Sequence, residues 1–312
     1  MNAQHRYRVF DSILTADIAL PELGPAETAL GSTDPQDLCS LSVGAVPDHL
    51  PEATTRTALH QAYADQDHLL TLPGFGRLRI SAGTRITFDP DPAANDAACS
   101  VAHWRTVVLS SGLTSLAYQR GLVPIHASSV VLPGEDGATL LLGHATAGKS
   151  TLAAALVQTG AHLLADDLTA LRIDAQGCVA LPGTRLIKLH EDSVRALGAD
   201  PALLEPVRPK LTKYFFAPGT FCSTPVPVLR CVILRHARSG QPEGFETRNG
   251  VSAFASVSNH IHRRRAGAAM GLRGALFQKL AILTRTVPIQ SYCFDQDFEA
   301  LGALAEGLRE AV

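Results

Sequence analysis

The stretch Thr139-Leu-Leu-Leu-Gly-His-Ala-Thr-Ala-Gly-Lys-Ser-Thr151 joins a short apolar run to a glycine-rich turn. Its centre, Gly143-x4-Gly148-Lys149-Ser150, is the phosphate-binding P-loop pattern. In this pattern the glycines let consecutive backbone N–H groups point at phosphate oxygens, and Lys149 adds a positive charge. Ser150 would place its hydroxyl on Mg²⁺. We interpret the stretch as a nucleotide site; the alternative is an ordinary Gly-rich turn between a strand and a helix.

The flanks of this loop have the character that the pattern requires. Residues 138–142 are apolar and predict a buried strand, and residues 151–157 predict a helix. Upstream, residues 125–132 predict a strand that pairs with 138–142 as a hairpin. His126 then stands at the start of a strand that neighbours the one bearing the loop.

An acidic pair follows the loop. Residues 161–165 predict a short apolar strand, and Asp166-Asp167 stands at its end. The 16 residues 150–165 leave room for one helix and one return strand. Proteins hold Mg²⁺ through oxygen ligands. Of two successive carboxylates, one can bind the metal and the other can act as the catalytic base. We therefore place Ser150 and Asp166 at the metal, although the order of the two carboxylates in these roles stays open. The alternative is a solvated Asp-Asp turn.

The rest of the chain predicts a mixed architecture. Residues 1–97 form a smaller accessory domain of mixed β character, and residues 98–312 form the P-loop domain. The first part contains antiparallel strands at 69–72, 76–80 and 84–88, and further strand pieces at 7–10 and 18–23; residues 32–65 are left unassigned. The second part contains a hairpin over 168–181, strands at 184–189, 228–234 and 289–294, a loop over 205–216, and helices at 98–120, 190–197, 252–265, 273–285 and 297–311. The fold class is α/β with an α+β tendency, a mixed sheet flanked by helices.

Composition excludes several classes of protein. With 46% hydrophobic and 18% charged residues, the chain has the make-up of an ordinary folded protein. The formal net charge of −2 gives no overall basic field, so we expect neither nucleic acid nor a membrane surface as a partner. No apolar run approaches the ~18 residues of a membrane span, and the N-terminus has no signal-peptide core. We expect a cytoplasmic location.

Two basic clusters have open interpretations. One cluster lies in a stretch interrupted by prolines and contains Arg208, Lys210 and Lys213. It either binds a triphosphate or forms a solvent-exposed face. The run Arg263-Arg-Arg265 closes the predicted helix 252–265. It either compensates a helix dipole at the surface or binds an acidic peptide or a phosphate.

Three segments together resemble the catalytic domain of HPr serine kinase/phosphatase and its relatives. These segments are Ile125-His-Ala-Ser-Ser-Val130, the loop Gly143–Thr151, and Gly160-Ala-His-Leu-Leu-Ala-Asp-Asp-Leu168. Phosphoenolpyruvate carboxykinase is a more distant cousin with a similar loop and acidic pair. The opening, Tyr7-Arg-Val-Phe10 with Leu20-Pro-Glu-Leu23, is similar to stand-alone HPr-kinase-like proteins, including kinases that phosphorylate lasso-peptide precursors.

The resemblance implies roles for particular residues. The nucleotide phosphates would be held by Gly143, His144, Ala145, Thr146, Ala147, Gly148, Lys149, Ser150 and Thr151. Asp166 and Asp167 would supply the metal ligand and the catalytic base, with His126 beside them, and Lys213 would add a cation over the phosphates. The Pro-Gly-Arg-Asn-like loop of the bifunctional enzymes has no counterpart here, so neither phosphatase activity nor their hexamer is implied. A homo-oligomer stays open.

The resulting hypothesis is a kinase that uses ATP and Mg²⁺ to phosphorylate a serine hydroxyl on a peptide or small protein, with a lasso-peptide precursor as one such acceptor. Lys149 would neutralise charge on the phosphates while one Asp accepts the hydroxyl proton. His126 either orients that Asp or the acceptor, or is a hydrogen-bonded structural histidine. Two other classes remain: a non-catalytic nucleotide-binding regulatory module, and a small-molecule or carboxykinase-like kinase.

Overall fold

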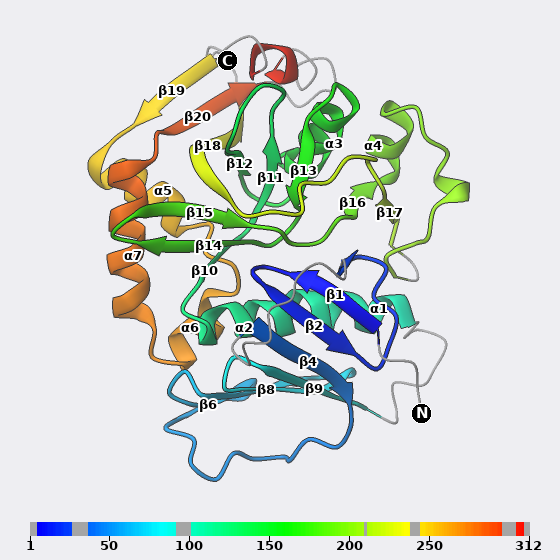
Figure 1. Cartoon of the computed structure of the whole chain (residues 1–312), viewed down its shortest axis with the longest axis vertical. Helices are drawn as coiled ribbons and strands as arrows, with labels where there is room; N and C mark the ends of the chain where they lie inside the picture. Colours follow the sequence, from blue (N-terminus) through cyan, green and yellow to red (C-terminus); the bar gives the residue numbers. More distant parts are fainter. Residues whose placement is uncertain are drawn as a thin grey trace.

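The computed structural model describes residues 5–26, 37–91, 101–208, 211–237, 244–294 and 304–308. It has a mixed α/β architecture in which large sheets predominate over helices, as predicted from the sequence at this coarse level (Figure 1). Within these residues no helix is both long enough and apolar enough to cross a membrane.

The first sheet is built from residues 5–90. Its strands are β1 (His5–Val9), β2 (Ser12–Ala16), β3 (Gly24–Pro25), β4 (Leu38–Val43), β5 (Thr55–Arg56), β6 (His60–Tyr63), β7 (Asp67–Leu72), β8 (Gly76–Ser81) and β9 (Arg85–Pro90). They are ordered β3-β1-β2-β4-β9-β8-β7-β6-β5. The division of the chain at residue 97 stays a prediction.

The predicted strands β7 to β9 are confirmed, and so is their buried face. Ala82 and Gly83 turn the β8–β9 hairpin with φ of 53° and 63°, and Leu78 and Phe88 face each other across it, both buried. The predicted strand at 18–23 is wrong. Strand β2 ends at Ala16, before this segment. Leu20 lies outside the sheet, and its backbone N–H donates a hydrogen bond to the Tyr7 hydroxyl at 2.8 Å.

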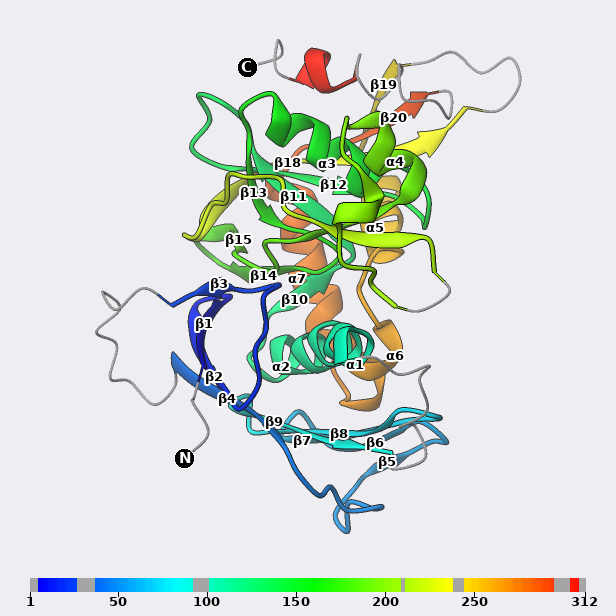
Figure 2. The ribbon, with the colours of Figure 1, turned by 90° about the vertical axis from the view of Figure 1, so that its right-hand side faces the viewer.

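A helical segment lies between the two large sheets (Figures 1 and 2). It consists of α1 (Val101–Val107), a π-helical turn over Val108–Gly112, and α2 (Leu113–Gln119). The predicted helix 98–120 is therefore confirmed over 101–119, except that π turn; residues 98–100 lie outside the described part. Its buried side chains pack with those of the first sheet and of β14 and β15 in one cluster that includes Ile86, Leu116 and Ala170.

The second sheet carries the glycine-rich loop. Its strands are β10 (Val123–Ile125), β11 (Ala127–Val131), β12 (Ala138–Leu142), β13 (His162–Ala165), β14 (Thr169–Asp174), β15 (Gly177–Leu181), β18 (Val226–His236), β19 (Gly244–Arg248) and β20 (Ile289–Phe294). The order is β10-β14-β15-β18-β12-β11-β13, and β20 pairs in parallel with β18. Strand β12 is parallel to β18 and antiparallel to β11.

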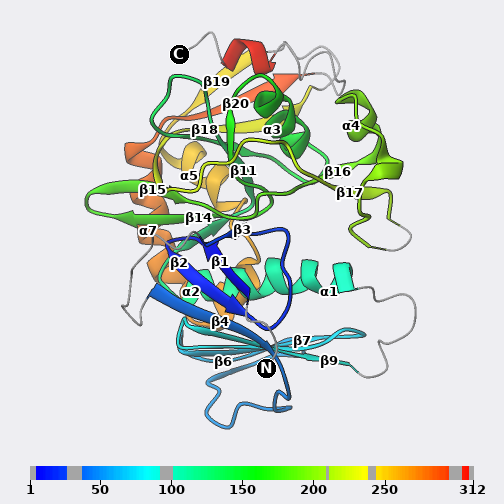
Figure 3. The ribbon, with the colours of Figure 1, turned by 45° about the vertical axis from the view of Figure 1, so that its right-hand side comes forward.

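Helices cover both faces of this sheet, as the separate core clusters show. One cluster joins the sheet to α5 (Gly250–Ser258) and α7 (Arg273–Thr286), and the other joins it to α3 (Lys149–Gln158) and the helical residues 304–308. Helix α4 (Glu191–Ala196) and the small sheet β16 (Ile187–His190) with β17 (Lys213–Phe216) lie near α3 (Figure 3).

Four predictions for this half need correction. The strand 125–132 is split at His126, where the chain passes from β10, paired with β14, to β11, paired with β12. The predicted strand 184–189 begins only at Ile187, and the stretch 205–216 is not wholly a loop, because β17 pairs with β16. The predicted helix 252–265 is broken between α5, which ends at Ser258, and α6 (Arg264–Ala269). Between them Ile261 forms a β-bridge with Ile125, and Arg263 has φ of 45°, which a right-handed helix does not adopt. Of the predicted helix 297–311 the structure describes only 304–308, and Lys210 also lies outside the described residues.

Candidate functional site

The glycine-rich loop joins β12 to the first turn of α3. Gly143 has φ of 152°, and a Cβ there would lie 2.9 Å from the Cβ of Ala147. Gly148 has φ of 85° directly before Lys149, the first residue of the helix. The loop thus needs glycine at both positions, for a close approach at the first and for a left-handed conformation at the second.

The Lys149 ammonium is folded over the loop. It is 7% exposed and donates hydrogen bonds to the carbonyl oxygens of Gly143, at 2.8 Å, and His144, at 3.0 Å. Burial lowers its pKa; the carboxylates of Asp166 and Asp167 oppose that shift, and Lys213 adds to it. A charged phosphate could replace the two carbonyls as the acceptor for this amine.

A cleft of about 640 Å³ opens in front of the loop. It brings together most of the residues that the sequence singled out, including His126, both aspartates and Lys213. Gly143 and His144 are not part of its wall; their carbonyls face Lys149 instead. The full lining is His126, Ala145, Thr146, Ala147, Gly148, Lys149, Ser150, Thr151, Asp166, Asp167, Lys188, Leu189, His190, Asp192, Ser193, Lys213, His236 and Phe294.

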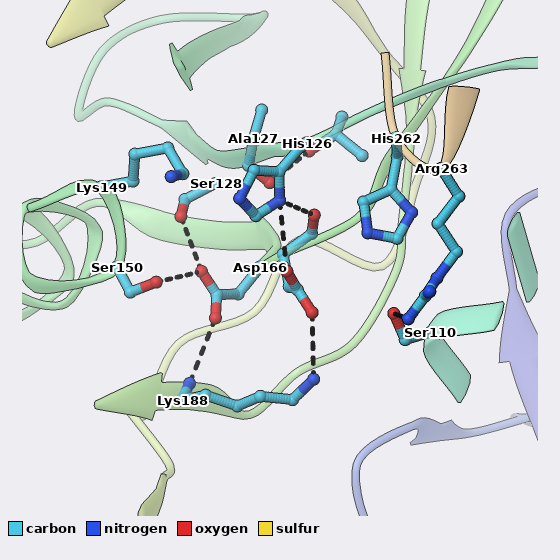
Figure 4. Close-up of polar contacts among 12 residues, drawn as sticks. Ser110, His126, Ala127, Ser128, Lys149, Ser150, Asp166, Lys188, His262 and Arg263 are labelled. Carbon is cyan, nitrogen blue, oxygen red and sulfur yellow. Dashed lines mark hydrogen bonds and ion pairs between the residues drawn. The ribbon is translucent and has the colours of Figure 1, made fainter. Parts of the chain in front are cut away.

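Asp166 is tied to the loop. It is 2% exposed, and its Oδ1 accepts hydrogen bonds from the hydroxyls of Ser150, at 2.9 Å, and Ser128, at 2.6 Å (Figure 4). Its Oδ2 accepts the backbone N–H of Lys188 at 3.1 Å. Each oxygen of this carboxylate therefore has a fixed direction, and one of them is aimed at the loop serine.

Asp167 faces the cleft. Its backbone has φ of 69°, which turns it away from the direction of Asp166. Its carboxylate lies 3.1 Å from the Lys188 ammonium and 3.2 Å from His126 Nδ1. Burial opposes the ionised form, but the charge of Lys188 and the hydrogen bond from His126 outweigh it and hold the pKa of Asp167 well below its usual range. The carboxylate is ionised at neutral pH.

His126 is held on two sides at the point where β10 passes into β11. Its Nδ1 also lies 2.9 Å from the backbone oxygen of Asp167, and its backbone N–H donates to the oxygen of His260 at 2.7 Å. Because both Asp167 groups accept hydrogen bonds, His126 Nδ1 carries the proton.

The turn between α5 and α6 supplies a second histidine. His262 Nδ1 lies 2.6 Å from the hydroxyl of Thr114. That hydroxyl itself donates to the backbone oxygen of Ser110 at 2.6 Å. His262 Nδ1 is therefore the donor to Thr114. Burial lowers the pKa of His262 to about 4, and the ring is neutral at pH 7. Its ring lies 5.6 Å from that of His126.

The residues present fit a magnesium ion next to the loop. Ser150 and Asp166 offer a hydroxyl and a carboxylate oxygen that already lie in contact, and such oxygens are the ligands that Mg²⁺ prefers. A second cluster, formed by His126, Asp167 and His262, has donor atoms within 4.8 Å of one another. There the Lys188 ammonium already neutralises Asp167, which disfavours another cation.

Three residues close to the acidic pair, Ser128, Lys188 and His262, were among those that the sequence did not single out. Ser128 and Lys188 both stand in segments that were predicted as strands, but nothing in a strand pattern shows which side chains meet an aspartate. His262 stands 148 residues from its partner Thr114, and no spacing rule connects them. Lys213, which the sequence did single out, lies on β17 in the wall of the cleft.

Comparisons with known proteins find distant similarity to solved structures. No protein-family model matches the chain, and no curated protein matches it in sequence. Among solved structures, the Hpr(Ser) kinase/phosphatase from Coxiella burnetii is similar to it, with a TM-score of 0.32 and 14% sequence identity. The match covers 60% of this chain and 95% of that one.

Proposed function

We propose that this protein is an ATP-dependent kinase that transfers the γ-phosphoryl group to a serine hydroxyl of a peptide or small protein. The observation that carries the proposal is the division of the acidic pair. Asp166 is hydrogen-bonded to Ser150 at the start of α3, whereas Asp167 points into the cleft with His126 and Lys188 around it. A motor or a GTPase switch has no need of a second carboxylate on the acceptor side.

In the proposed reaction the loop and Lys149 bind the phosphates, and Ser150 and Asp166 hold Mg²⁺, which supplies neutralising charge when bound. The acceptor serine lies between the γ-phosphorus and Asp167. As its oxygen bonds to phosphorus, the bond to the bridging oxygen of ADP breaks and the hydroxyl proton passes to the Asp167 carboxylate. Because that carboxylate is a weak base, proton transfer accompanies bond formation rather than preceding it.

His126 and Lys188 act as positioning residues in this proposal. Each contacts Asp167 directly, at 3.2 and 3.1 Å, so together they fix the direction of the carboxylate. The charge of Lys188 and the hydrogen bond from His126 also keep it ionised. Lys213, on the wall of the same cleft, adds positive charge that favours a triphosphate.

The first test is phosphoryl transfer from ATP labelled at the γ position, with Mg²⁺ and serine peptides that include lasso-precursor sequences. We expect phosphoserine on the peptide and none on a matched Ser→Ala peptide. The Lys149→Ala variant should lose transfer by about 10²–10³-fold, since it removes a charge aimed at the phosphates. Its thermal unfolding should stay close to that of the wild type. Wild-type transfer by Lys149→Ala would overturn the assignment.

The same experiment separates the two other classes. A regulatory nucleotide-binding module would bind ATP and leave every acceptor unlabelled. A small-molecule kinase would label free serine, a sugar or oxaloacetate in preference to a peptide. Either result would replace the proposal.

A further inference from the structure

A second cleft, of about 450 Å³, lies away from the first one, between the edge of the N-terminal sheet and helices α6 and α7. Figure 1 shows α6 beside β6, at the foot of α7. The residues of its wall that carry the argument are Thr57, Leu59, His60, Arg265, Ala269 and Arg273. We call this cleft the edge groove.

The charges of the edge groove have one sign. Arg265 and Arg273 are exposed, and within the described part of the chain neither guanidinium has a hydrogen-bond or ion-pair partner. None of the described residues that line the groove is acidic. Other arginines, such as Arg79 with Asp67 and Arg195 with Glu191, are paired. Two unpaired guanidiniums beside one hollow favour an anionic partner.

The floor of the groove is apolar, and one wall is the turn that joins β5 to β6. Leu59 is 39% exposed, and Ala268 and Ala269 come from α6 opposite. Strand β5 is the last strand at this end of the sheet, and it pairs with β6. A peptide in this groove can therefore place aliphatic side chains on the floor while its carboxylates meet the arginines.

A basic run connects the edge groove to the candidate active site. Arg265 lines the groove, and Arg263, two residues earlier, donates to the Ser110 hydroxyl at 3.0 Å beside His262 (Figure 4). The turn that bears Arg263 also holds His126 through the backbone oxygen of His260. Burial, and then the charges of Arg263 and Arg265, lower the pKa of His60 in the groove wall. Positive charge is thus continuous from the groove to the side of Asp167.

We propose that the edge groove docks an acidic, aliphatic-rich segment of the peptide substrate, so that a serine in the same peptide reaches Asp167. The inference rests on the proposed kinase function and adds the substrate class. A nucleic acid is the weaker candidate, because the groove offers aliphatic side chains and no Phe, Tyr or Trp ring for stacking among the described residues that line it.

Binding without ATP tests the docking site separately from catalysis. A fluorescein-labelled peptide of alternating Glu and Leu, carrying one Ser, would be titrated with the full chain and followed by fluorescence anisotropy. We expect Arg265→Glu and Arg273→Glu each to weaken binding about tenfold or more. Arg285→Glu, an exposed arginine in the last turn of α7, is the matched control and should bind as the wild type does. Binding should also weaken with salt.

Four outcomes would overturn the docking site. Two concern the variants: the Glu/Leu peptide binds both variants as tightly as the wild type, or Arg285→Glu weakens its binding as much as they do. Two concern the ligand: a Lys/Leu peptide binds as tightly as the Glu/Leu peptide, or a single-stranded oligonucleotide of the same charge displaces the bound peptide at a lower concentration than unlabelled peptide does. Nucleotide affinity and transfer to a short serine peptide without acidic residues should be unchanged in both variants. If no transfer occurs with any acceptor but the peptide still binds through Arg265 and Arg273, the kinase proposal fails and the docking site stands.

Discussion

Two neighbouring aspartates acquire different chemistry from their surroundings. Asp166 is almost wholly buried and accepts hydrogen bonds from Ser128, Ser150 and the backbone of Lys188. The left-handed backbone at Asp167 turns the second carboxylate toward the cleft. A carboxylate with fixed oxygen directions suits a metal ligand, and one open to the cleft suits a base.

This contrast predicts unequal effects of two isosteric substitutions. Asp166→Asn should weaken Mg²⁺-dependent nucleotide binding, because it removes the negative charge next to Ser150. Asp167→Asn should keep nucleotide affinity and lose about 10²–10⁴-fold in transfer, the range expected for a missing general base. Titration with a fluorescent ATP analogue, with and without Mg²⁺, together with transfer rates, measures both. The reverse pattern would exchange the two roles.

At the scale of elements, the site depends on how β12, its loop and α3 follow one another. Strand β12 is buried along its whole length between β18 and β11, so the position at which the loop leaves the sheet is fixed. At that point Gly143 lies against Ala147 and the backbone oxygen of Leu234, near the carboxyl end of β18. The close packing leaves no room for a side chain and sets the path of the loop.

We therefore expect Gly143→Ala to damage nucleotide binding. Its Cβ would lie 2.9 Å from the Ala147 Cβ and 3.1 Å from the Leu234 oxygen, so the loop must shift. The matched control is Gly134→Ala in the turn between β11 and β12, which has φ of 84° but no atom within 4 Å of an added Cβ. Both variants should lose about 1 kcal/mol of unfolding free energy for backbone strain. Only Gly143→Ala should lose nucleotide affinity; equal affinity in both variants would contradict the role of close packing.

For the whole molecule, the N-terminal sheet and the second sheet are joined through the helical segment between them. His68 of β7 is fully buried, and its ring lies 3.0 Å from the Ser115 hydroxyl of α2 and 3.1 Å from the ring of His60. Burial, and then His60, lower the pKa of His68 to about 3. His68 is thus a neutral group at a junction of elements that are distant in the sequence.

This histidine predicts a pH-dependent stability. The unfolded ring titrates near 6.5 and the folded ring near 3, so the unfolded state binds more protons between these values and stability falls as the pH falls. At pH 5 the loss is roughly 2 kcal/mol for this group, from 1.5 pH units at about 1.4 kcal/mol each. His260 and His262, whose pKa burial lowers to about 4, add to it.

Urea unfolding between pH 7 and pH 4.5 measures this effect. The His68→Gln variant should show a shallower fall in unfolding free energy than the wild type, whatever its stability at pH 7. His162→Gln, at an exposed position, should leave the slope unchanged. An identical slope in wild type and His68→Gln would show that His68 is not the titrating group.

Much of the fold around the loop could be predicted because its signals are local. The buried strand 138–142, the hairpin over 168–181 and the helix 273–285 follow from apolar periodicity and turn residues. The errors occurred where a tertiary contact overrides that periodicity. The strand 125–132 breaks at His126 to change neighbours. The helix 252–265 breaks after Ser258, where Ile261 pairs with Ile125 and the Arg263 side chain reaches Ser110 in the π-helical turn.

The sequence by itself determined the glycine-rich loop and the acidic pair at the end of the next strand, because both are set by short-range spacing. It also marked His126 and Lys213 as candidates. Only the tertiary structure decided that Asp166 contacts Ser150, that Lys188 and His262 surround Asp167, and that Arg265 and Arg273 share a groove with β6. Such contacts join residues far apart in the chain, and their positions depend on how the sheets and helices pack rather than on any local pattern.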